Sequence, residues 1–225
     1  MKLLIDSADI KAIKELYEIL PISGVTTNPS ILYRQNKNPK EVLLEIKEIV
    51  KDDEMHVQAI GTTCKEFVED AKAIAEALGK DIYIKIPAIK EGYRAMKILK
   101  KEGYHITATA IYYESQALLA SSIGVDYIAP YYNRICKEGM NGIEVISSMK
   151  KIIEGTDTKI LAASFKTEEQ VARVASLSVE AMTLSPDVYN QLTDHQKIDD
   201  VTRVFNEDFY SLIGSQSTLK DILST

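Results

Sequence analysis

Short apolar runs rich in β-branched residues alternate along the chain with longer segments in which apolar residues recur every three or four positions. The short runs are typical of buried strands, and the longer segments have the period of amphipathic helices. Eight strands are predicted, at residues 2–6, 23–28, 55–60, 81–87, 104–112, 125–131, 159–164 and 180–185. A helix is predicted after each strand, at residues 10–20, 39–50, 64–78, 91–103, 114–124, 141–155, 168–178 and 186–192.

This alternation predicts an α/β protein. Eight β–α units in about 200 residues favour a (β/α)8 TIM barrel, and a doubly wound open sheet is the second possibility. No GxGxxG or P-loop motif indicates nucleotide binding in either case. We expect one barrel domain over residues 1–200 and an extra C-terminal helix and tail over residues 201–225. The aromatic face of that helix could cap its own barrel or dock on a neighbouring subunit, and the pattern alone does not decide between the two.

Composition narrows the class of protein. The 225 residues are 45% hydrophobic and 27% charged, with a net charge of −6 and no basic stripe that would suit nucleic acid. The chain has no signal-peptide core and no apolar run of the roughly 18 residues that a membrane span needs. Its two cysteines and three histidines match no disulfide or metal framework. We expect a cytoplasmic protein without a metal, a cofactor, or a nucleic-acid or membrane partner.

Lys85 stands in the middle of the isoleucine-rich stretch DIYIKIPA. Lysines near strand ends commonly snorkel to solvent or protect an edge. In a barrel, however, active sites lie at the carboxyl ends of the strands, and seven other polar residues fall at such ends. These are Asp6, Thr26, Asn28, Gln58, Thr109, Tyr131 and Ser164. Each one could be an ordinary strand or helix-capping residue, but together they predict a site.

A lysine that points into this interior has chemistry available to it. Desolvation lowers the pKa of a buried amine and raises the neutral fraction that can form a Schiff base with a carbonyl. The resulting iminium withdraws electrons, so that a neighbouring carbon–carbon bond can break. Asp6, Tyr131, Thr109 and Gln58 would supply the proton transfers and hold water. The sequence therefore predicts that Lys85 is catalytic.

A phosphate site is predicted near the sixth and seventh strands. Arg134 follows Tyr131 by three residues, and Ser164 and Lys166 lie just before a helix. A guanidinium, a hydroxyl, an amine and a helix N-terminus can together hold one phosphate monoester. The alternative is that these residues are surface charges around a loop.

The chain resembles the family of small transaldolases and fructose-6-phosphate aldolases over nearly its whole length. The stretches that carry the resemblance are LLIDSAD, GVTTNPSI, GTT, IKIPA, TATAIY, APYYNRI and LAASFKT. The most specific of them are GVTTNPSI and the lysine within IKIP. The resemblance implies a class I aldolase on a (β/α)8 barrel.

The resemblance also implies catalytic roles. Lys85 would be the Schiff-base lysine, and Asp6 would bind substrate hydroxyls and assist proton transfer. Thr109 and Gln58 would hold the catalytic water, and Tyr131 would act with that water as acid and base.

Further positions would bind substrate. Thr26 and Asn28 would line the site for the donor half, and Arg134, Ser164 and Lys166 would take the phosphate of the aldehyde half. The substrates implied are a sugar phosphate and dihydroxyacetone. Four residues at the rim are bulkier or more charged than the resemblance leads us to expect, namely Tyr112, Tyr113, Glu114 and Tyr132. The resemblance therefore does not predict the substrate preference at the rim.

The two branches of the family differ at two positions of this chain. Transaldolases keep a glutamate where this chain has Gln58, and typically a phenylalanine where it has Tyr131. The resemblance therefore favours an aldolase that converts fructose 6-phosphate to dihydroxyacetone and glyceraldehyde 3-phosphate, and the reverse. The alternative is a transaldolase of the pentose phosphate pathway that passes the dihydroxyacetone unit to erythrose 4-phosphate. A sugar-phosphate-binding barrel without chemistry is a third possibility, and the joint presence of Lys85, Asp6 and Tyr131 argues against it.

The resemblance implies a homo-oligomer, commonly a decamer of two pentamers. In such assemblies the C-terminal helix packs on a neighbouring subunit, which favours that arrangement for residues 201–225.

Overall fold

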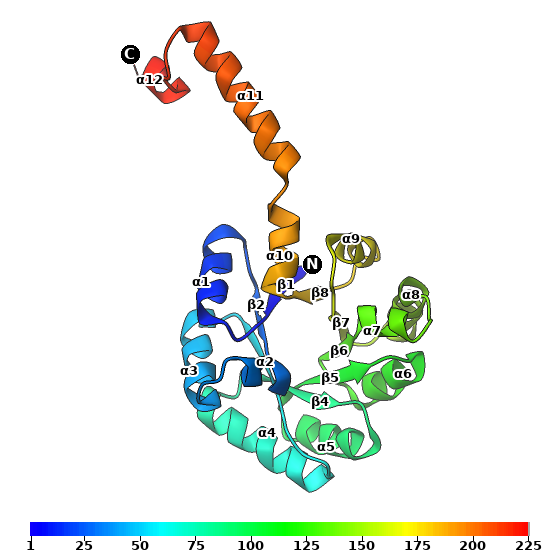
Figure 1. The fold of residues 1–225 in the computed structure, drawn as a ribbon. Coiled ribbons are helices and arrows are strands. Elements are labelled where there is room, and N and C mark those ends of the chain that lie inside the picture. The colour runs from blue at the N-terminus through cyan, green and yellow to red at the C-terminus, as the bar shows by residue number, and fades with distance from the viewer. Residues whose placement is uncertain (225) are drawn as a thin grey trace. The chain divides into compact units, whose positions relative to one another are not determined.

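Eight parallel strands close into a barrel in the computed structural model, which describes residues 1–224 (Figure 1). Each strand pairs with the next, and β8 pairs with β1, so the open-sheet alternative is wrong and the predicted (β/α)8 barrel is confirmed. The strands are β1 (Lys2–Asp6), β2 (Gly24–Thr26), β3 (Glu54–Gln58), β4 (Tyr83–Pro87), β5 (His105–Ile111), β6 (Tyr127–Pro130), β7 (Lys159–Ala162) and β8 (Ala181–Leu184).

Helices follow the strands and surround the barrel (Figure 1). Those predicted are α1 (Ile10–Ile19), α3 (Pro39–Val50), α4 (Cys64–Leu78), α5 (Lys90–Lys101), α6 (Glu114–Ile123), α8 (Gly142–Ile152), α9 (Glu168–Ala175) and α10 (Pro186–Thr193). The extra C-terminal helix predicted from residue 201 onward is α11 (Gln196–Ile213), which begins five residues earlier. Three short helices were not predicted, namely α2 (Pro29–Arg34), α7 (Tyr132–Lys137) and α12 (Leu219–Leu223).

Capping residues fix where several helices begin. The Asn38 side chain accepts a hydrogen bond from the amide of Lys40, and Pro39 occupies the first position of α3. The Thr63 side chain accepts from the amide of Glu66, whose carboxylate accepts from the Thr63 amide in return, forming a capping box at the start of α4. These contacts satisfy backbone donors that the first turn of a helix leaves unpaired.

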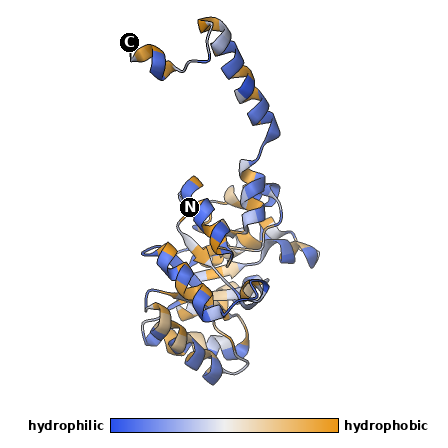
Figure 2. Ribbon diagram, turned by 60° about the vertical axis from the view of Figure 1, so that its left-hand side comes forward, coloured by the Kyte–Doolittle hydropathy of each residue, from blue (hydrophilic) through white to orange (hydrophobic). Residues whose placement is uncertain are grey.

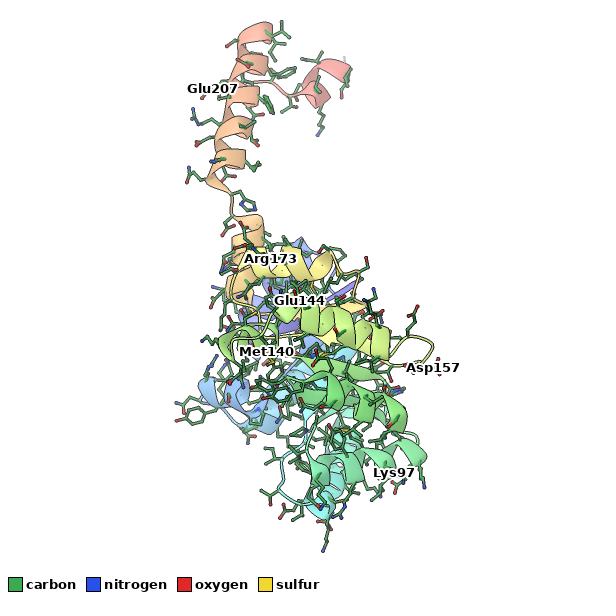
Figure 3. The ribbon with its side chains drawn as sticks, turned by 90° about the vertical axis from the view of Figure 1, so that its right-hand side faces the viewer. Lys97, Met140, Glu144, Asp157, Arg173 and Glu207 are labelled. Atoms are coloured by element: carbon green, nitrogen blue, oxygen red, sulfur yellow. The ribbon has the colours of Figure 1, made fainter. Side chains whose placement is uncertain are left out.

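The hydrophobic core lies between the strands and the helices. Ile82, Ile84 and Ile86 alternate along DIYIKIP, and none is more than 1% exposed. Figure 2 shows apolar residues on the strands and on the sides of the helices that face them. Charged side chains such as Lys97 and Arg173 lie on the outer surfaces of the helices (Figure 3). Alternate strand residues therefore pack outward, and the remaining ones are left to fill the barrel.

The chain divides into two compact units, residues 1–189 and residues 190–225. The first contains the barrel. The second contains α11 and α12, and Ile198, Phe205 and Leu212 of α11 are 61%, 66% and 81% exposed. Within residues 1–224, no helix combines the length and the apolar character needed to cross a membrane.

Candidate active site

Lys85 lies inside the barrel near the carboxyl end of β4. Its register partners are Gln58 on β3 and Thr107 on β5, and its side chain is buried. The ammonium group donates a hydrogen bond of 2.8 Å to the main-chain oxygen of Thr27. Burial lowers the pKa of Lys85, and the charge of Asp6 partly opposes this shift. The surroundings of this lysine therefore increase the neutral, nucleophilic fraction of its amine.

A directed chain of hydrogen bonds ends at Asp6. The Thr26 hydroxyl donates to Asp6 Oδ1 at 2.6 Å, and it lies 2.8 Å from the hydroxyl of Thr183 on β8. Because a hydroxyl has one proton to donate, Thr183 must be the donor to Thr26. Both threonines are buried, and they orient the Asp6 carboxylate. Thr183 was missed by the sequence analysis, although it alternates with Ala181 on a strand that was predicted.

Thr109 and Tyr131 form a second polar pair in the barrel. Their hydroxyl oxygens lie 2.9 Å apart, and Thr109 is buried. Burial raises the pKa of Tyr131, and the hydrogen bond with Thr109 acts in the opposite direction. A phenol with a raised pKa stays protonated at neutral pH, so Tyr131 carries a proton within the barrel mouth.

Arg134 lies against the aromatic residues of the rim. Its guanidinium carbon is 4.9 Å from the centre of the Tyr131 ring, and Nη1 donates to the Tyr112 hydroxyl at 3.3 Å. The Tyr112 and Tyr131 rings are 5.9 Å apart, centre to centre. The guanidinium is therefore held beside the proposed proton donor, and Tyr112 joins the site from the end of β5.

Ser164 and Lys166 lie in the loop between β7 and α9. Ser164 has a left-handed backbone conformation, with φ of 66°, and its carbonyl accepts from the amide of Asn133 at 3.0 Å. The amide of Lys166 donates to Gln170 Oε1 at 2.8 Å, and Gln170 Nε2 donates to Asn133 Oδ1 at 3.1 Å. The Lys166 residue is exposed. Gln170 therefore links this loop to α7, the helix that carries Arg134.

Asn28 and Gln58 complete the set of predicted residues. Asn28 caps α2, because its Oδ1 accepts from the amide of Ile31 at 3.0 Å. With its oxygen engaged, Asn28 can offer a substrate the two N–H donors of Nδ2. Gln58 ends β3 beside Lys85 and is partly exposed. The structure therefore brings the predicted residues of β1 to β6 to one end of the barrel.

A separate polar cluster fills the barrel at the level of His56, which is fully buried. His56 Nδ1 is 2.9 Å from the Thr107 hydroxyl, and Nε2 is 3.4 Å from Glu54 Oε2. Tyr127 also donates to Glu54, at 3.0 Å. Burial lowers the pKa of His56. Burial raises that of Glu54, but its hydrogen bonds with His56 and Lys2 outweigh this effect and hold the pKa at about 2. A neutral imidazole that donates from Nε2 to a carboxylate accepts at Nδ1 from the threonine.

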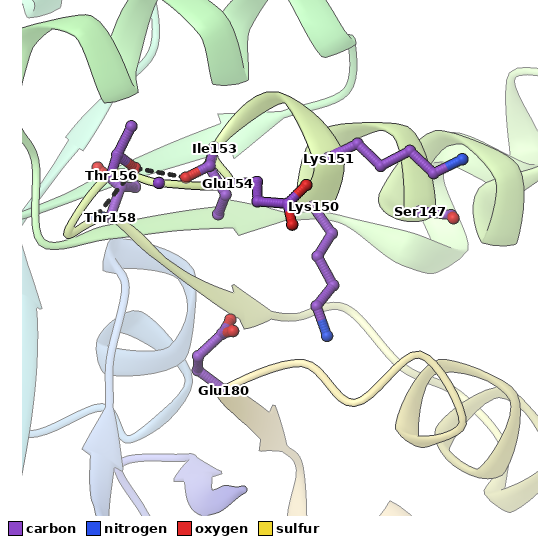
Figure 4. Close-up of a pocket in the computed structure, with 9 residues that line it drawn as sticks. Ser147, Lys150, Lys151, Ile153, Glu154, Thr156, Thr158 and Glu180 are labelled. Carbon is purple, nitrogen blue, oxygen red and sulfur yellow. Dashed lines mark hydrogen bonds between the residues drawn. The ribbon is translucent and has the colours of Figure 1, made fainter.

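A cavity of about 410 Å³ lies at the opposite end of the barrel, next to the residues that precede β7 and β8 (Figure 4). Lys150 and Glu180 line it. Lys150 donates to the Leu177 carbonyl at 2.7 Å, and Glu180 accepts from the amide of Ile160 at 2.9 Å. Lys150 therefore ties α8 to the turn that precedes β8, and Glu180 ties the residue before β8 to β7. These two charged groups of the cavity therefore have structural partners.

The groups at the mouth support chemistry on a carbonyl. A buried amine lies near a carboxylate, and a phenol–hydroxyl pair and a guanidinium are within the same barrel mouth. Among residues 1–224, no three His, Cys, Asp or Glu side chains gather in a way that could hold a metal ion. The fold and the site define a (β/α)8 barrel whose mouth contains a buried lysine.

Comparison with known proteins identifies the family. The family model described as transaldolase/fructose-6-phosphate aldolase matches residues 3–224. A protein of Streptococcus pneumoniae named "Probable fructose-6-phosphate aldolase" is 38% identical over 221 residues, covering 96% of this chain and 100% of that protein. The chain belongs to the transaldolase/fructose-6-phosphate aldolase family and is an enzyme of this type.

A solved structure with low sequence identity shares the fold. The crystal structure of inosine 5′-monophosphate dehydrogenase from Legionella pneumophila superposes with a TM-score of 0.59 at 13% identity. The match covers 84% of this chain and 58% of the dehydrogenase chain. At this identity, the similarity extends to the barrel alone.

Proposed function

We propose that this enzyme is a class I aldolase that interconverts fructose 6-phosphate with dihydroxyacetone and glyceraldehyde 3-phosphate. The observation that carries the proposal is the burial of the Lys85 amine close to Asp6 in the barrel mouth. The relative named a fructose-6-phosphate aldolase supports the choice of substrates. Tyr131, a proton donor in the same mouth, supports release of the donor half as free dihydroxyacetone.

The first half of the reaction forms and uses the Schiff base. The neutral amine of Lys85 attacks the C2 carbonyl of the ketose, and the carbinolamine hydroxyl takes up a proton and leaves as water, which gives the cationic iminium. Asp6 accepts the proton of the C4 hydroxyl while the bond between C3 and C4 breaks. The electron pair of that bond moves into the iminium and leaves an enamine, and C4 becomes the carbonyl carbon of glyceraldehyde 3-phosphate. Thr26 holds the Asp6 carboxylate in the orientation that this transfer needs.

The second half releases the three-carbon donor. Tyr131 protonates C3 of the enamine and regenerates the iminium, with Thr109 as its hydrogen-bond partner. A water molecule held by Gln58 and Thr109 then adds to C2, and dihydroxyacetone leaves as the amine is restored. Asn28 and Thr26 bind hydroxyls of the donor half.

The phosphate of the aldehyde half binds to Arg134, Ser164 and Lys166. The hydrogen bond with Tyr112 and the contact with the Tyr131 ring keep the guanidinium at the rim. We further propose that the enzyme is cytoplasmic, acts in carbohydrate metabolism and forms a homo-oligomer, in which α11 packs on a neighbouring subunit.

The test is the release of glyceraldehyde 3-phosphate from fructose 6-phosphate alone, followed over time at a known enzyme concentration. We expect continuous release well beyond one equivalent per chain. A burst of about one equivalent that stops, and resumes when erythrose 4-phosphate is added, would instead identify the transaldolase of the pentose phosphate pathway. Absence of release under both conditions would contradict both assignments.

A further inference from the structure

The strand β5 contains one extra residue next to the site. Between two pairs in register with β6, Ala108–Ile128 and Ile111–Pro130, β5 advances by three residues and β6 by two. Ala110 lies within this bulge and has φ of 56°, in the left-handed region. A non-glycine residue there costs about 1–3 kcal/mol, so other contacts must hold it in place. Bulges of this kind often re-aim side chains beside active sites.

The bulge reverses the alternation of side chains along β5. Before it, Thr109 faces the interior and contacts Tyr131. Without the extra residue, Ile111 would follow on the same side two positions later, and Tyr112 would point outward. In the structure Ile111 is 0% exposed, and Tyr112 is the residue that contacts Arg134 and Tyr131. The contact between Tyr112 and Arg134 therefore depends on the bulge.

Gln116 holds the bulge from the first turn of α6. Its Nε2 donates to the carbonyls of Ala110 and Ala88, each at 3.1 Å. Its Oε1 accepts from the amides of Tyr112 and Tyr113, at 2.8 and 3.0 Å. One side-chain amide thus joins the carbonyl of Ala110 to the amides of Tyr112 and Tyr113, and connects this segment to Ala88, which follows β4.

We propose that Gln116 is a positioning residue that holds the β5 bulge, and that Tyr112 is the specificity-determining residue that it directs toward Arg134. This arrangement sets the preference of the enzyme for phosphorylated over neutral aldehydes, and in that respect it rests on the proposed aldolase function. Tyr112 keeps the guanidinium at the rim, where an anionic group of the aldehyde arrives.

A purely structural role for Gln116 makes a different prediction. At the third position of α6, its oxygen caps the helix much as Glu66 caps α4. A glutamate at position 116 would keep these two acceptor contacts. It would lose both N–H donors and place carboxylate oxygens against the carbonyls of Ala88 and Ala110. Gln116→Glu therefore separates helix capping from support of the bulge.

The experiment measures kcat/KM for condensation of dihydroxyacetone with glyceraldehyde 3-phosphate and with unphosphorylated glyceraldehyde. We expect Gln116→Glu and Tyr112→Phe each to reduce the ratio of the two values by about tenfold. In each variant the Arg134 guanidinium loses its hydrogen bond with the Tyr112 hydroxyl, by displacement of Tyr112 in the first and by removal of the hydroxyl in the second. The matched control is Glu66→Gln, which makes the reverse change at the equivalent position of α4. It should leave the ratio unchanged. Circular dichroism and the yield of the borohydride-trapped adduct with dihydroxyacetone identify folded, active variants.

An unchanged ratio in folded Gln116→Glu would overturn the role of Gln116, and an unchanged ratio in Tyr112→Phe would overturn that of Tyr112. Should Gln116→Glu not fold, Ala110→Val replaces it, because a β-branched residue opposes the left-handed conformation. We expect Ala110→Val to lower the ratio and Ala110→Gly, which favours the bulge, to preserve it. A wild-type enzyme that forms no adduct and condenses neither aldehyde would instead refute the proposed function.

Discussion

The hydroxyl of Thr109 on β5 lies 2.9 Å from the hydroxyl of Tyr131 at the end of β6. This contact pairs the phenol with a group that can pass a proton to or from water. In the proposed mechanism, Tyr131 protonates the enamine that remains after bond cleavage.

Tyr131→Phe is expected to slow steady-state cleavage of fructose 6-phosphate by about 10²–10⁴-fold, the usual contribution of a general acid. Formation of the first enamine should change far less, because it precedes this proton transfer. Rapid quenching after mixing would measure the first equivalent of glyceraldehyde 3-phosphate, and continuous assay would measure turnover. Unaltered turnover would remove Tyr131 from the proton step.

Asp6→Asn tests the electrostatic link between Asp6 and Lys85. Burial lowers the pKa of Lys85, and the negative charge of Asp6 raises it. Removing that charge should lower the pKa further, so that reductive trapping of dihydroxyacetone extends to lower pH while cleavage is slowed. An unmoved pH profile, or a shift to higher pH, would contradict this link. Asp157→Asn, which changes an exposed carboxylate in the loop before β7, is the matched control, and Lys85→Met should yield no adduct at any pH.

Arg134→Ala tests the phosphate site. We expect KM for glyceraldehyde 3-phosphate to rise by about 10–100-fold, since a charge-assisted contact with phosphate is lost. The kinetics with unphosphorylated glyceraldehyde should change little. Arg173→Ala, which removes an exposed arginine paired with Glu169 on α9, should affect neither aldehyde. Equal losses for the two aldehydes would locate the phosphate site elsewhere.

The Glu54 carboxylate makes the free energy of unfolding depend on pH in the acid range. Its pKa is about 2 in the folded protein and 4.5 in the reference state, so the folded form binds fewer protons between these values. The stabilisation is present above pH 4.5 and is lost as the pH falls toward 2. Urea unfolding should show Glu54→Gln to be less stable at neutral pH by up to about 3 kcal/mol and less sensitive to acid. Glu45→Gln, in an exposed pair with Lys14, should change little; an equal effect of both changes would refute the prediction.

The exposed apolar residues of α11 test the proposed assembly. Phe205 and Leu212 lie seven positions apart and therefore on one face of the helix. Phe205→Ser with Leu212→Ser should reduce the molar mass measured by light scattering, and Asp200→Asn on the same helix should not. A mass that is unchanged in the double variant would show that this face does not hold subunits together.

Local signals were sufficient to predict much of the barrel. The bounds of α3 and α4 match those predicted, because Asn38 with Pro39 and Thr63 with Glu66 mark the starts of these helices. The strand predicted at residues 23–28 ends at Thr26, since Asn28 turns out of the strand to cap α2. The short helices α2 and α7 were missed because six residues are too few to show a helical period.

The site was predictable in its residue types and less so in its geometry. Alternation along predicted strands indicated Lys85, Thr109 and Tyr131, whose side chains the structure places in the barrel. It could not indicate the bulge at Ala110, because alanine has no preference for a left-handed conformation. In the structure the Ala110 carbonyl accepts a hydrogen bond from Gln116 at the start of α6, and strand alternation gives no sign of this contact.

The hydrogen bond from Lys85 to the Thr27 carbonyl has a stereochemical consequence. A primary amine with one N–H bond directed at a fixed acceptor keeps its lone pair in one of the two remaining staggered positions about Cε–Nζ. The amine can then meet a ketone from only these two directions, and the barrel wall limits them further. In the proposed reaction, the face of the carbonyl that is attacked would be selected by a main-chain oxygen, which no side-chain substitution at position 27 removes.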